Sequence, residues 1–400
     1  MNTAPKSALP PAVVMGLSPT GLHVIRALGR AGIPVIGVTD GTQAGTRSRY
    51  CKTVISVSDP AEKLEKLCRA FPADGPKPIL IPTSDQDIDL LCDNAERLAR
   101  HFRFQPSYRD GLARQIMDKE SFYRLCKTHG VAYPQLWSGT KDQIAGLALD
   151  IRYPCMIKPA LIQLVKDQMK GQKGWIAQNA QDYARQIEQI PAQAGTLLVQ
   201  EIVPGPESNI SLWCGYLNGQ DTHASFTARK LRQFPPGFGS ASLVQSHPEP
   251  DSAGIATRFL TALGYRGIAA AEFKTDPNTG KPIIIEINVR PSLWFSITEP
   301  AGRPVVLSAY CDMAGLPVPP ARPQIDSLRW RYGPKDLYSS LFYRLRHGFV
   351  LPTPKTEATG PAQQRTYAVF AWDDPMPALA ELGNFARKAL RRLIGGRNGG

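Results

Sequence analysis

Three polar side chains interrupt an apolar segment in the last third of the chain. Glu286, Asn288 and Arg290 alternate with apolar residues in the run Ile-Ile-Ile-Glu-Ile-Asn-Val-Arg at 283–290. Successive side chains of a β-strand point to opposite faces, so we expect the three polar groups on one face. Ile285 and the alternate residues after it are expected on a buried face. Carboxylate and amide oxygens side by side suit a hard cation such as Mg²⁺.

A second carboxylate is expected opposite the first. Glu272 lies in an apolar segment at 269–274, and the sequence Asp-Pro-Asn-Thr-Gly at 276–280 is typical of a turn. A hairpin symmetric about Thr279 pairs Glu272 with Glu286. Directly opposed like charges destabilise a hairpin unless they are neutralised, which a divalent cation would do with Asn288 as a further ligand. The alternative is a hairpin face that water solvates.

A lysine ends a short apolar segment near the middle of the chain. Lys158 is the last residue before a proline in the segment 153–159. A buried lysine needs an anionic partner, and phosphate oxygens would provide one. The following residues, 160–174, are rich in lysine and include Lys173. They fit either a phosphate-covering loop or a solvated surface loop.

The segment 197–207 predicts a strand that ends in a proline–glycine hinge. The backbone N–H and C=O groups of such a hinge can meet the edge of a planar base. Glu207, just beyond it, is placed to bind the hydroxyls of a ribose. The segment thus fits a nucleotide-binding hinge.

The strand and helix patterns of the first 100 residues predict a doubly wound α/β domain at the start of the chain. Residues 12–40 fit a strand, a turn, a helix and a second strand, which is a βαβ unit. Further strand and helix patterns follow to residue 100. Ser18, Thr20 and Asp85 lie where strands end, and such positions bind ligands in parallel sheets. The same residues also fit as helix caps.

Taken in order, these motifs resemble the ATP-grasp superfamily. The motifs are Asp-Lys at 118–119, Pro-x-x-x-Lys-Pro at 154–159, Val-Gln-Glu at 199–201, Glu272, and Glu-x-Asn-x-Arg at 286–290. The resemblance covers about residues 12–316 and is greatest to the carboxylate–amine ligase branch that includes D-aspartate ligase-like enzymes. It implies an α/β and α+β fold. A Rossmann-like pre-ATP-grasp domain (1–110) would precede an ATP-grasp domain (111–318) with two subdomains that meet near 200–205, and a basic C-terminal extension (319–400) would follow.

The resemblance also implies a role for each motif residue. Phosphates would be bound by Lys119, Lys158 and Lys173, adenine by Gln200, Glu201 and Val203, ribose by Glu207, and Mg²⁺ or Mn²⁺ by Glu272, Glu286 and Asn288. Arg290, with Arg229 or Lys230, would stabilise an acyl-phosphate.

The implied activity is that of an ATP- and Mg²⁺-dependent ligase. A substrate carboxylate would be activated as an acyl-phosphate and coupled to an amine of an amino acid, a peptide or an amino-sugar precursor. The sequence departs from the family at 160–164, where Ala-Leu-Ile-Gln-Leu replaces a compact run of glycines. This departure motivates the alternative of a catalytically inactive ATP-binding protein with a regulatory or assembly role.

Composition indicates an ordinary globular chain in a reducing compartment. The 400 residues are 42% hydrophobic, and the longest apolar runs are too short to span a bilayer. Seven scattered cysteines include no C-x-x-C pair, which argues against a zinc site and a disulfide framework. We therefore expect a cytoplasmic protein with small-molecule partners, and we leave a homodimer open.

Positive charge is concentrated in the last fifth of the chain. The net charge is +13, and residues 319–400 hold 13 Lys and Arg against six Asp and Glu. No zinc-finger, RNP or helix-turn-helix signature accompanies the basic excess, so nucleic acid is not the expected partner. Residues 378–394 fit an amphipathic helix with Leu379 and Leu382 on its apolar face. It would lie on an anionic membrane surface or pack on its own domain.

Overall fold

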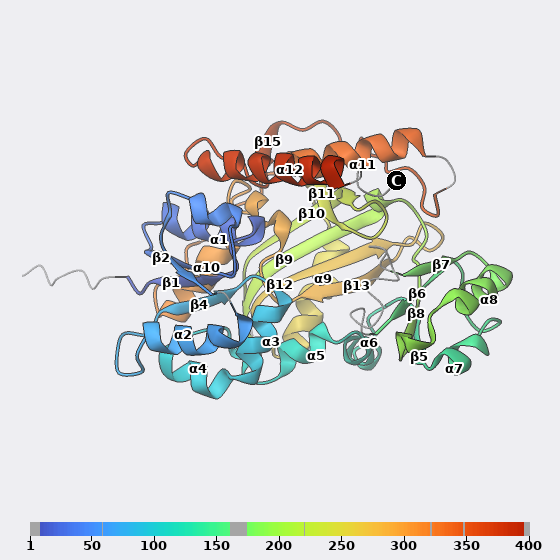
Figure 1. Cartoon of the computed structure of the whole chain (residues 1–400), viewed down its shortest axis with the longest axis horizontal. Helices are drawn as coiled ribbons and strands as arrows, with labels where there is room; N and C mark the ends of the chain where they lie inside the picture. The colour runs from blue at the N-terminus through green and yellow to red at the C-terminus, as the bar shows by residue number, and fades with distance from the viewer. Residues whose placement is uncertain are drawn as a thin grey trace, which may run out of the picture.

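The computed structural model describes residues 9–57, 59–160, 174–219, 221–320, 322–346 and 349–395. Three β-sheets organise these residues (Figure 1). A parallel sheet lies near the N-terminus, a small antiparallel sheet is formed by the middle of the chain, and a seven-stranded sheet is built from later segments.

The N-terminal domain contains the predicted βαβ unit. Its parallel strands run in the order β3-β2-β1-β4. The turn after β1 needs glycine at two positions: Gly16 has φ +80°, and a Cβ on Gly21 would lie 1.9 Å from the Gly16 carbonyl oxygen. This close approach seats the first helix on the sheet. The elements are β1 (Ala12–Met15), α1 (Pro19–Arg30), β2 (Val35–Thr39), β3 (Cys51–Ser56), α2 (Lys63–Ala70), β4 (Ile79–Pro82), α3 (Asp85–Asp93) and α4 (Ala95–His101).

Two helices lead from this domain to the small sheet. The side chain of Asp118 accepts a hydrogen bond from Ser121 N at 2.8 Å and so caps the second of them, α6. The small sheet has the strand order β5-β8-β6-β7 and is covered by two further helices. The elements are α5 (Leu112–Met117), α6 (Lys119–Thr128), β5 (Leu136–Gly139), α7 (Lys141–Ala145), β6 (Cys155–Pro159), β7 (Trp175–Ala177), α8 (Ala180–Gln189) and β8 (Leu197–Glu201).

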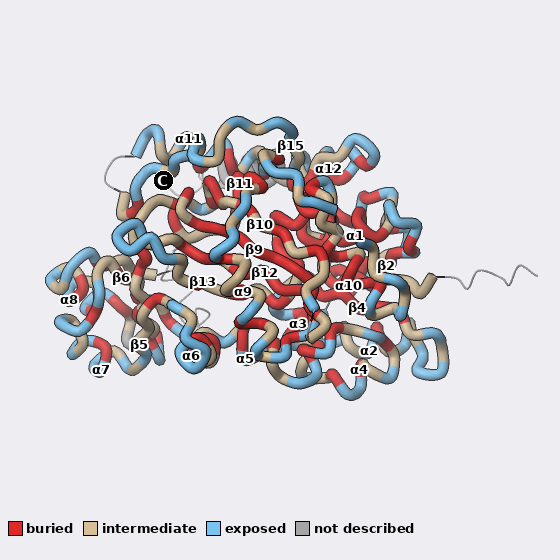
Figure 2. Tube along the Cα trace, turned by 180° about the vertical axis from the view of Figure 1, so that it is seen from behind, coloured by how far each residue is buried: buried red, intermediate tan, exposed pale blue. Residues whose placement is uncertain are grey.

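The large sheet forms the centre of the molecule. Its strand order is β13-β12-β9-β10-β11-β14-β15, and eight of the nine residues of β9 are buried. Figure 2 shows β9 and its neighbours β10 and β12 as the buried interior. The elements are β9 (Ile210–Asn218), β10 (Thr222–Phe234), β11 (Ser240–Ser246), α9 (Pro250–Ala262), β12 (Arg266–Thr275), β13 (Pro282–Asn288), α10 (Val305–Ala314), β14 (Leu328–Arg331), α11 (Gly333–Leu345), β15 (Gln364–Tyr367) and α12 (Met376–Gly395).

The C-terminal segment is integrated into the fold. β14 pairs with β11, and β15 pairs with β14, so residues 328–367 extend the large sheet by two strands. Just before α12, Asp374 accepts hydrogen bonds from Arg26 Nε at 2.9 Å and Ser48 Oγ at 2.6 Å. The segment is therefore attached both to the central sheet and to the N-terminal domain.

Candidate active site

A cleft of about 1340 Å³ separates the small sheet from the large one. One wall is formed by β6 and β8, and the other by β12, β13 and the turn after β10. The N-terminal domain closes one end with the residues that follow β1 and β4. Nine of the residues predicted from the sequence line this cleft: Lys119, Lys158, Gln200, Glu201, Val203, Glu272, Glu286, Asn288 and Arg290.

Glu272 and Glu286 are paired across β12 and β13, as the sequence predicted. Burial raises the pKa of Glu272, Glu286 raises it further by like-charge repulsion, and the Lys230 ammonium opposes both. That ammonium donates to Glu272 Oε2 at 2.5 Å. Asn288 follows on the same face, with Nδ2 3.3 Å from Glu286 Oε1. Two carboxylates and an amide thus meet at one point of the cleft.

A β-bulge at Ile285 creates this register. Phe273 pairs with Ile284 while Glu272 pairs with Glu286, so Ile285 is the extra residue. The prediction that Ile285 faces the core was wrong, because the bulge shifts the alternation: Ile284 and Ile287 are buried, and Ile285 lines the cleft. Its carbonyl oxygen accepts hydrogen bonds from Lys119 Nζ at 2.7 Å and from the Tyr123 hydroxyl at 3.1 Å.

A chain of hydrogen bonds crosses the cleft from one wall to the other. Lys158 Nζ donates to Gln200 Oε1 at 3.2 Å, and Gln200 Nε2 donates to the Tyr123 hydroxyl at 2.8 Å. Tyr123 in turn donates to the bulge carbonyl of Ile285. Burial lowers the pKa of Lys119, and Glu286 and Glu272 raise it. Sequence reasoning missed Tyr123, although it lies four residues after Lys119 and so on the same face of α6.

The hinge after β8 lines the cleft with Glu201, Ile202 and Val203. The N–H of Glu201 donates to the Gln135 carbonyl at 2.9 Å. Within the part of the chain that the structure describes, the N–H of Val203 donates to no backbone carbonyl. Glu201 C=O and Val203 N–H would supply the acceptor and the donor that the edge of an adenine requires.

Glu207 does not line the cleft, which corrects its predicted role in binding ribose. It is fully buried. Its carboxylate accepts hydrogen bonds from Gln233 N at 2.9 Å, from Gly237 N, and from the Tyr343 hydroxyl at 2.7 Å. These donors occupy both oxygens, so Glu207 fixes the turn after β10 against α11.

The two basic residues predicted on β10 have different environments. Lys230 is buried behind Glu272 and reaches the cleft only through that carboxylate. Arg229, the next residue, points to the other face of the strand, where its Nε donates to Glu249 Oε1 at 2.6 Å. The catalytic role predicted for Arg229 is therefore withdrawn, and Lys230 is assigned to positioning Glu272.

Arg290 joins the two domains at the end of the cleft. Its Nε donates to Asp85 Oδ1 at 2.7 Å, and Asp85 is the first residue of α3. Ser18 and Thr20, at the start of α1, line the same end. Ser18 occupies the N-cap position but makes no side-chain capping hydrogen bond. Ser18, Thr20 and Asp85, which the sequence offered as either ligand groups or caps, thus line the same cleft as Arg290.

The cleft also contains cationic groups that the sequence did not reveal. Lys274 is 5% exposed and lies two residues beyond Glu272 on β12. Its position could have been predicted from its spacing, because residues two apart on a strand share a face and Lys274 lies two residues after Glu272. Lys335 lies 4.3 Å from the centre of the Tyr332 ring, and both line the cleft. The C-terminal segment is therefore part of the site.

Comparison with known proteins agrees with this geometry. No protein-family model matches the chain. The D-aspartate ligase of Enterococcus faecium is 24% identical over 226 residues, which are 54% of this chain and 53% of that protein. An N5-carboxyaminoimidazole ribonucleotide synthetase, solved in complex with ADP, matches with a TM-score of 0.61 at 13% identity, covering 80% of this chain and 81% of that one. An L-amino acid ligase from Bacillus licheniformis has a TM-score of 0.57 at 12% identity, covering 77% and 75%.

The chain has the ATP-grasp fold. The α/β and α+β fold class predicted from the sequence is thereby confirmed. The predicted C-terminal extension instead contributes β14 and β15 to the large sheet. The chain spans about half the length of the curated relative that it matches.

One predicted ATP-grasp element lies outside the described residues. Lys173 is not among them, and neither are residues 161–164 of the stretch 160–164 that departs from the usual glycine run. Gly174, the first described residue after that stretch, packs closely on β6: a Cβ there would lie 2.5 Å from the Ile157 carbonyl oxygen.

The donor set at the end of the ATP-grasp cleft fits Mg²⁺. No cluster of three or more His, Cys, Asp or Glu side chains suited to a metal occurs among the described residues. Glu272, Glu286 and Asn288 instead supply two carboxylates and one amide oxygen. Mg²⁺ typically takes one or two carboxylates and completes its octahedron with water and substrate phosphates. Such a partial set suits a cation that arrives with a nucleotide.

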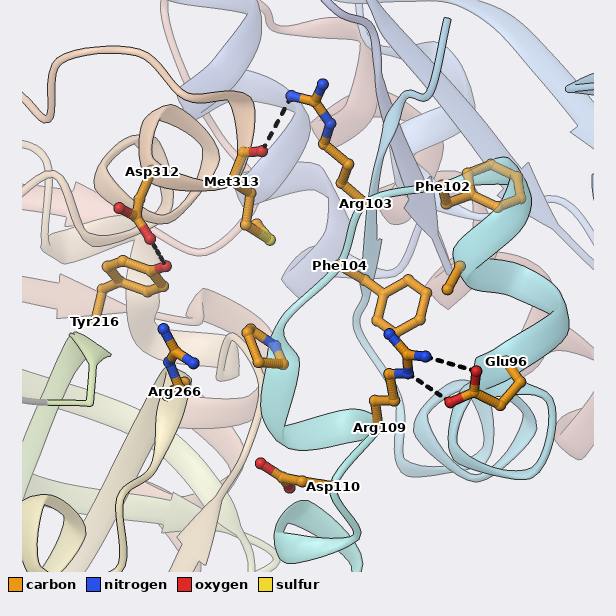
Figure 3. A pocket seen from close by; sticks show the side chains of 12 residues that line it. Glu96, Phe102, Arg103, Phe104, Arg109, Asp110, Tyr216, Arg266, Asp312 and Met313 are labelled. Carbon is orange, nitrogen blue, oxygen red and sulfur yellow. Dashed lines mark hydrogen bonds and ion pairs between the residues drawn. The ribbon is translucent and has the colours of Figure 1, made fainter. Parts of the chain in front are cut away.

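A second cavity of about 760 Å³ lies apart from the ATP-grasp cleft (Figure 3). It is formed between the N-terminal domain and β12 and contains none of the predicted site residues. Arg109 is bound there by Glu96 in a two-point pair, and Tyr216 donates to Asp312. Its charged groups are largely satisfied by protein partners.

Proposed function

We propose that the protein is an ATP- and Mg²⁺-dependent ligase that joins a carboxylate to an amine. The observation that carries this proposal is the opposed pair of Glu272 and Glu286 inside a cleft that also contains Lys119, Lys158 and Arg290. Carboxylates for a cation and three basic side chains in one cleft suit the transfer of a phosphoryl group. The names of the relatives, a D-aspartate ligase and an L-amino acid ligase, support the same class of reaction.

The chemistry has two balanced steps. An oxygen of the substrate carboxylate forms a bond to the γ-phosphorus of ATP, and the bond from that phosphorus to the β–γ bridging oxygen breaks to release ADP. The amine nitrogen then bonds to the acyl carbon and loses a proton, while the carbon–oxygen bond to phosphate breaks. Neither step needs a covalent enzyme intermediate, so the task of the protein is to position charge.

Each wall of the cleft has a defined task in this proposal. Val203 N–H and Glu201 C=O bind the base, and Lys119 and Lys158 bind phosphate oxygens. Glu272, Glu286 and Asn288 would hold Mg²⁺, which neutralises charge on the transferred phosphoryl group. Arg290, next to Ser18 and Thr20, binds the anionic substrate.

Trapping of the acyl-phosphate tests the proposal directly. The protein is incubated with ATP, Mg²⁺, hydroxylamine and a panel of amino acids, peptides and amino-sugar precursors that begins with D-aspartate. We expect ADP release together with a hydroxamate for the true carboxylate substrate. The Glu286→Gln variant should produce neither, and Glu188→Gln, which changes an exposed carboxylate on α8, should match the native protein.

The same experiment distinguishes the ligase from the alternative function. Tight Mg²⁺-dependent ATP binding without ADP release across the whole panel would replace the ligase by a catalytically inactive ATP-binding regulatory or assembly protein. Failure of ATP to bind at all would overturn both.

A further inference from the structure

Exposed apolar side chains are concentrated on the C-terminal segment. Of the eleven large apolar side chains that are exposed among the described residues, ten lie between Ile325 and Leu382. The remaining one is Leu149, in the small subdomain. Exposed large apolar side chains concentrated in one segment indicate an interaction surface.

The helix α11 presents one such row. Leu337, Leu341 and Leu345 recur every four residues and are 55%, 45% and 78% exposed. The opposite side of the helix packs on β10, where Asp336 binds Arg232 and the Ser339 hydroxyl donates to the Gln233 carbonyl. The helix therefore has a buried polar side and an exposed apolar side, the reverse of an ordinary surface helix.

The helix α12 presents a second row. Met376, Leu379 and Leu382 are 53%, 59% and 57% exposed. The helix is held to the protein by other side chains: Phe385 packs on the core, and Glu381 accepts a hydrogen bond from the Tyr332 hydroxyl at 2.6 Å. The predicted apolar face of this helix thus points outward over the part whose side chains are described.

The two helices lie along the same edge of the molecule. Figures 1 and 2 both show α11 and α12 along this edge. We define the docking face as the exposed apolar side chains of α11 and α12. Trp372, 89% exposed, lies in the loop that leads into α12.

Positive charge accompanies the docking face. Arg344 and Arg346 are exposed on either side of Leu345, and the sequence of α12 carries Arg387, Lys388, Arg391 and Arg392. Residues 319–400 have a net excess of seven positive charges. Two such faces would repel each other, whereas an anionic lipid surface attracts basic residues and accepts apolar side chains.

We propose that the docking face binds the surface of an anionic phospholipid membrane. The attachment is peripheral, since no helix among the described residues is long and apolar enough to cross a bilayer. The inner side of α11 borders the cleft through Lys335, and Tyr343 of the same helix holds Glu207. Docking therefore places the nucleotide cleft one helix away from the lipid headgroups.

Vesicle flotation of the full-length protein tests the proposal. We expect the protein to float with vesicles that contain phosphatidylglycerol, to remain behind with pure phosphatidylcholine, and to dissociate as salt rises. The double variant Leu341→Glu/Leu345→Glu should lower the partition coefficient by about tenfold or more, because membrane affinity scales with buried apolar area. Leu149→Glu is the matched control and should float like the native protein.

Further measurements distinguish a loss of membrane binding from misfolding of the variant. Met376→Glu/Leu379→Glu should reproduce the loss from the other helix, and each variant should keep the native circular dichroism spectrum. Trp372 emission should shift to the blue on anionic vesicles, and Trp372→Phe should abolish the shift.

Three outcomes would overturn the proposal. These are equal flotation with neutral vesicles, unchanged flotation of both double variants, and a doubled mass in sedimentation without lipid that Leu341→Glu/Leu345→Glu abolishes. The last would make the face an interface between two copies of the chain.

Discussion

Glu272 and Glu286 face each other across β12 and β13, and Glu272 is bound by a buried lysine of the neighbouring strand β10. Lys230 Nζ lies 2.5 Å from Glu272 Oε2, and its side chain is 2% exposed. Glu286 instead lies beside Asn288 at the open side of the pair. The two carboxylates therefore contribute differently to folding and to ligand binding.

Neutralising the two carboxylates should have different effects on stability. Glu286→Gln leaves the buried pair of Lys230 and Glu272 intact, so we expect it to lower the melting temperature less than Glu272→Gln does. It should weaken Mg²⁺-dependent ATP binding roughly tenfold or more, because cation affinity follows ligand charge. Glu272→Gln leaves Lys230 buried without its anion, and removing one partner of a buried pair costs about 3–5 kcal/mol. Differential scanning fluorimetry and calorimetric titration with ATP measure both effects. Equal melting temperatures for the two variants would contradict this division.

Glu207 should matter for folding and not for recognition of ribose. Glu207→Ala leaves the buried N–H groups of Gln233 and Gly237 without an acceptor, and each unsatisfied buried donor costs about 1–3 kcal/mol. Tyr343→Phe removes the third donor and should cost less. We expect both variants to melt earlier and to keep the native preference between ATP and 2′-deoxy-ATP. A stable Glu207→Ala protein that has lost this preference would restore the ribose role.

The hairpin of β12 and β13 was predicted only in part from the sequence. The register of Glu272 with Glu286 was predicted correctly, but the turn itself follows a different symmetry, with Thr275 opposite Pro282. Only the extra residue Ile285 brings the two carboxylates level. The periodicity of the sequence shows which residues alternate, but it does not reveal a bulge. The bulge leaves a carbonyl outside the strand pairing, and hydrogen bonds from the distant residues Lys119 and Tyr123 satisfy it.

The role of a residue could not be predicted from the sequence where it depends on a partner far away in the chain. Glu207 has the spacing of a nucleotide ligand, and Tyr343, 136 residues later, binds it instead. Arg229 and Lys230 are adjacent basic residues, and only the pairing of β10 decides which one faces Glu272. In the C-terminal segment the alternation of Leu328 and Trp330 with arginines was a usable strand signal, since both apolar residues are buried in the large sheet.

A half-buried acid, Glu299, whose Oε2 lies 3.3 Å from His23 Nε2 of α1, should make stability fall with pH near neutrality. Burial raises the pKa of Glu299 from 4.5 to about 8, and burial lowers the pKa of the neighbouring His23 from 6.5 to about 3. The stability due to protonated Glu299 is fully present below 4.5 and is lost as the pH rises through 8. His23 acts in the opposite direction but only below 6.5, since there the unfolded chain binds the extra proton.

Between pH 6.5 and 8, Glu299 is therefore the member of this pair that changes stability. We expect the free energy of unfolding to fall by up to about 1.4 kcal/mol per pH unit in that window. Glu299→Gln should flatten the slope, whereas the exposed control Glu188→Gln should not. Melting temperatures measured across the window test this, and an equal slope in both variants would exclude Glu299 as the cause.

Two adjacent aspartates offer a matched test of how the C-terminal segment is attached. Asp374 is buried and accepts hydrogen bonds from Arg26, Ser48 Oγ and Arg49 N. Asp373 is 41% exposed and pairs with Arg30. Both join the start of α12 to the N-terminal domain across more than 300 residues of sequence, so they differ mainly in burial.

Asp374→Asn should therefore be much more damaging than Asp373→Asn. The first leaves the Arg26 guanidinium buried without a counter-charge, at a cost of about 3–5 kcal/mol, while an exposed pair is worth about 1 kcal/mol or less. Urea titration followed by fluorescence measures both, and limited proteolysis should cut Asp374→Asn near residue 370 first, because α12 begins two residues after the lost anchor. Equal losses in the two variants would mean that the segment is attached by its apolar contacts, chiefly Phe385 on the core, and not by the buried ion pair.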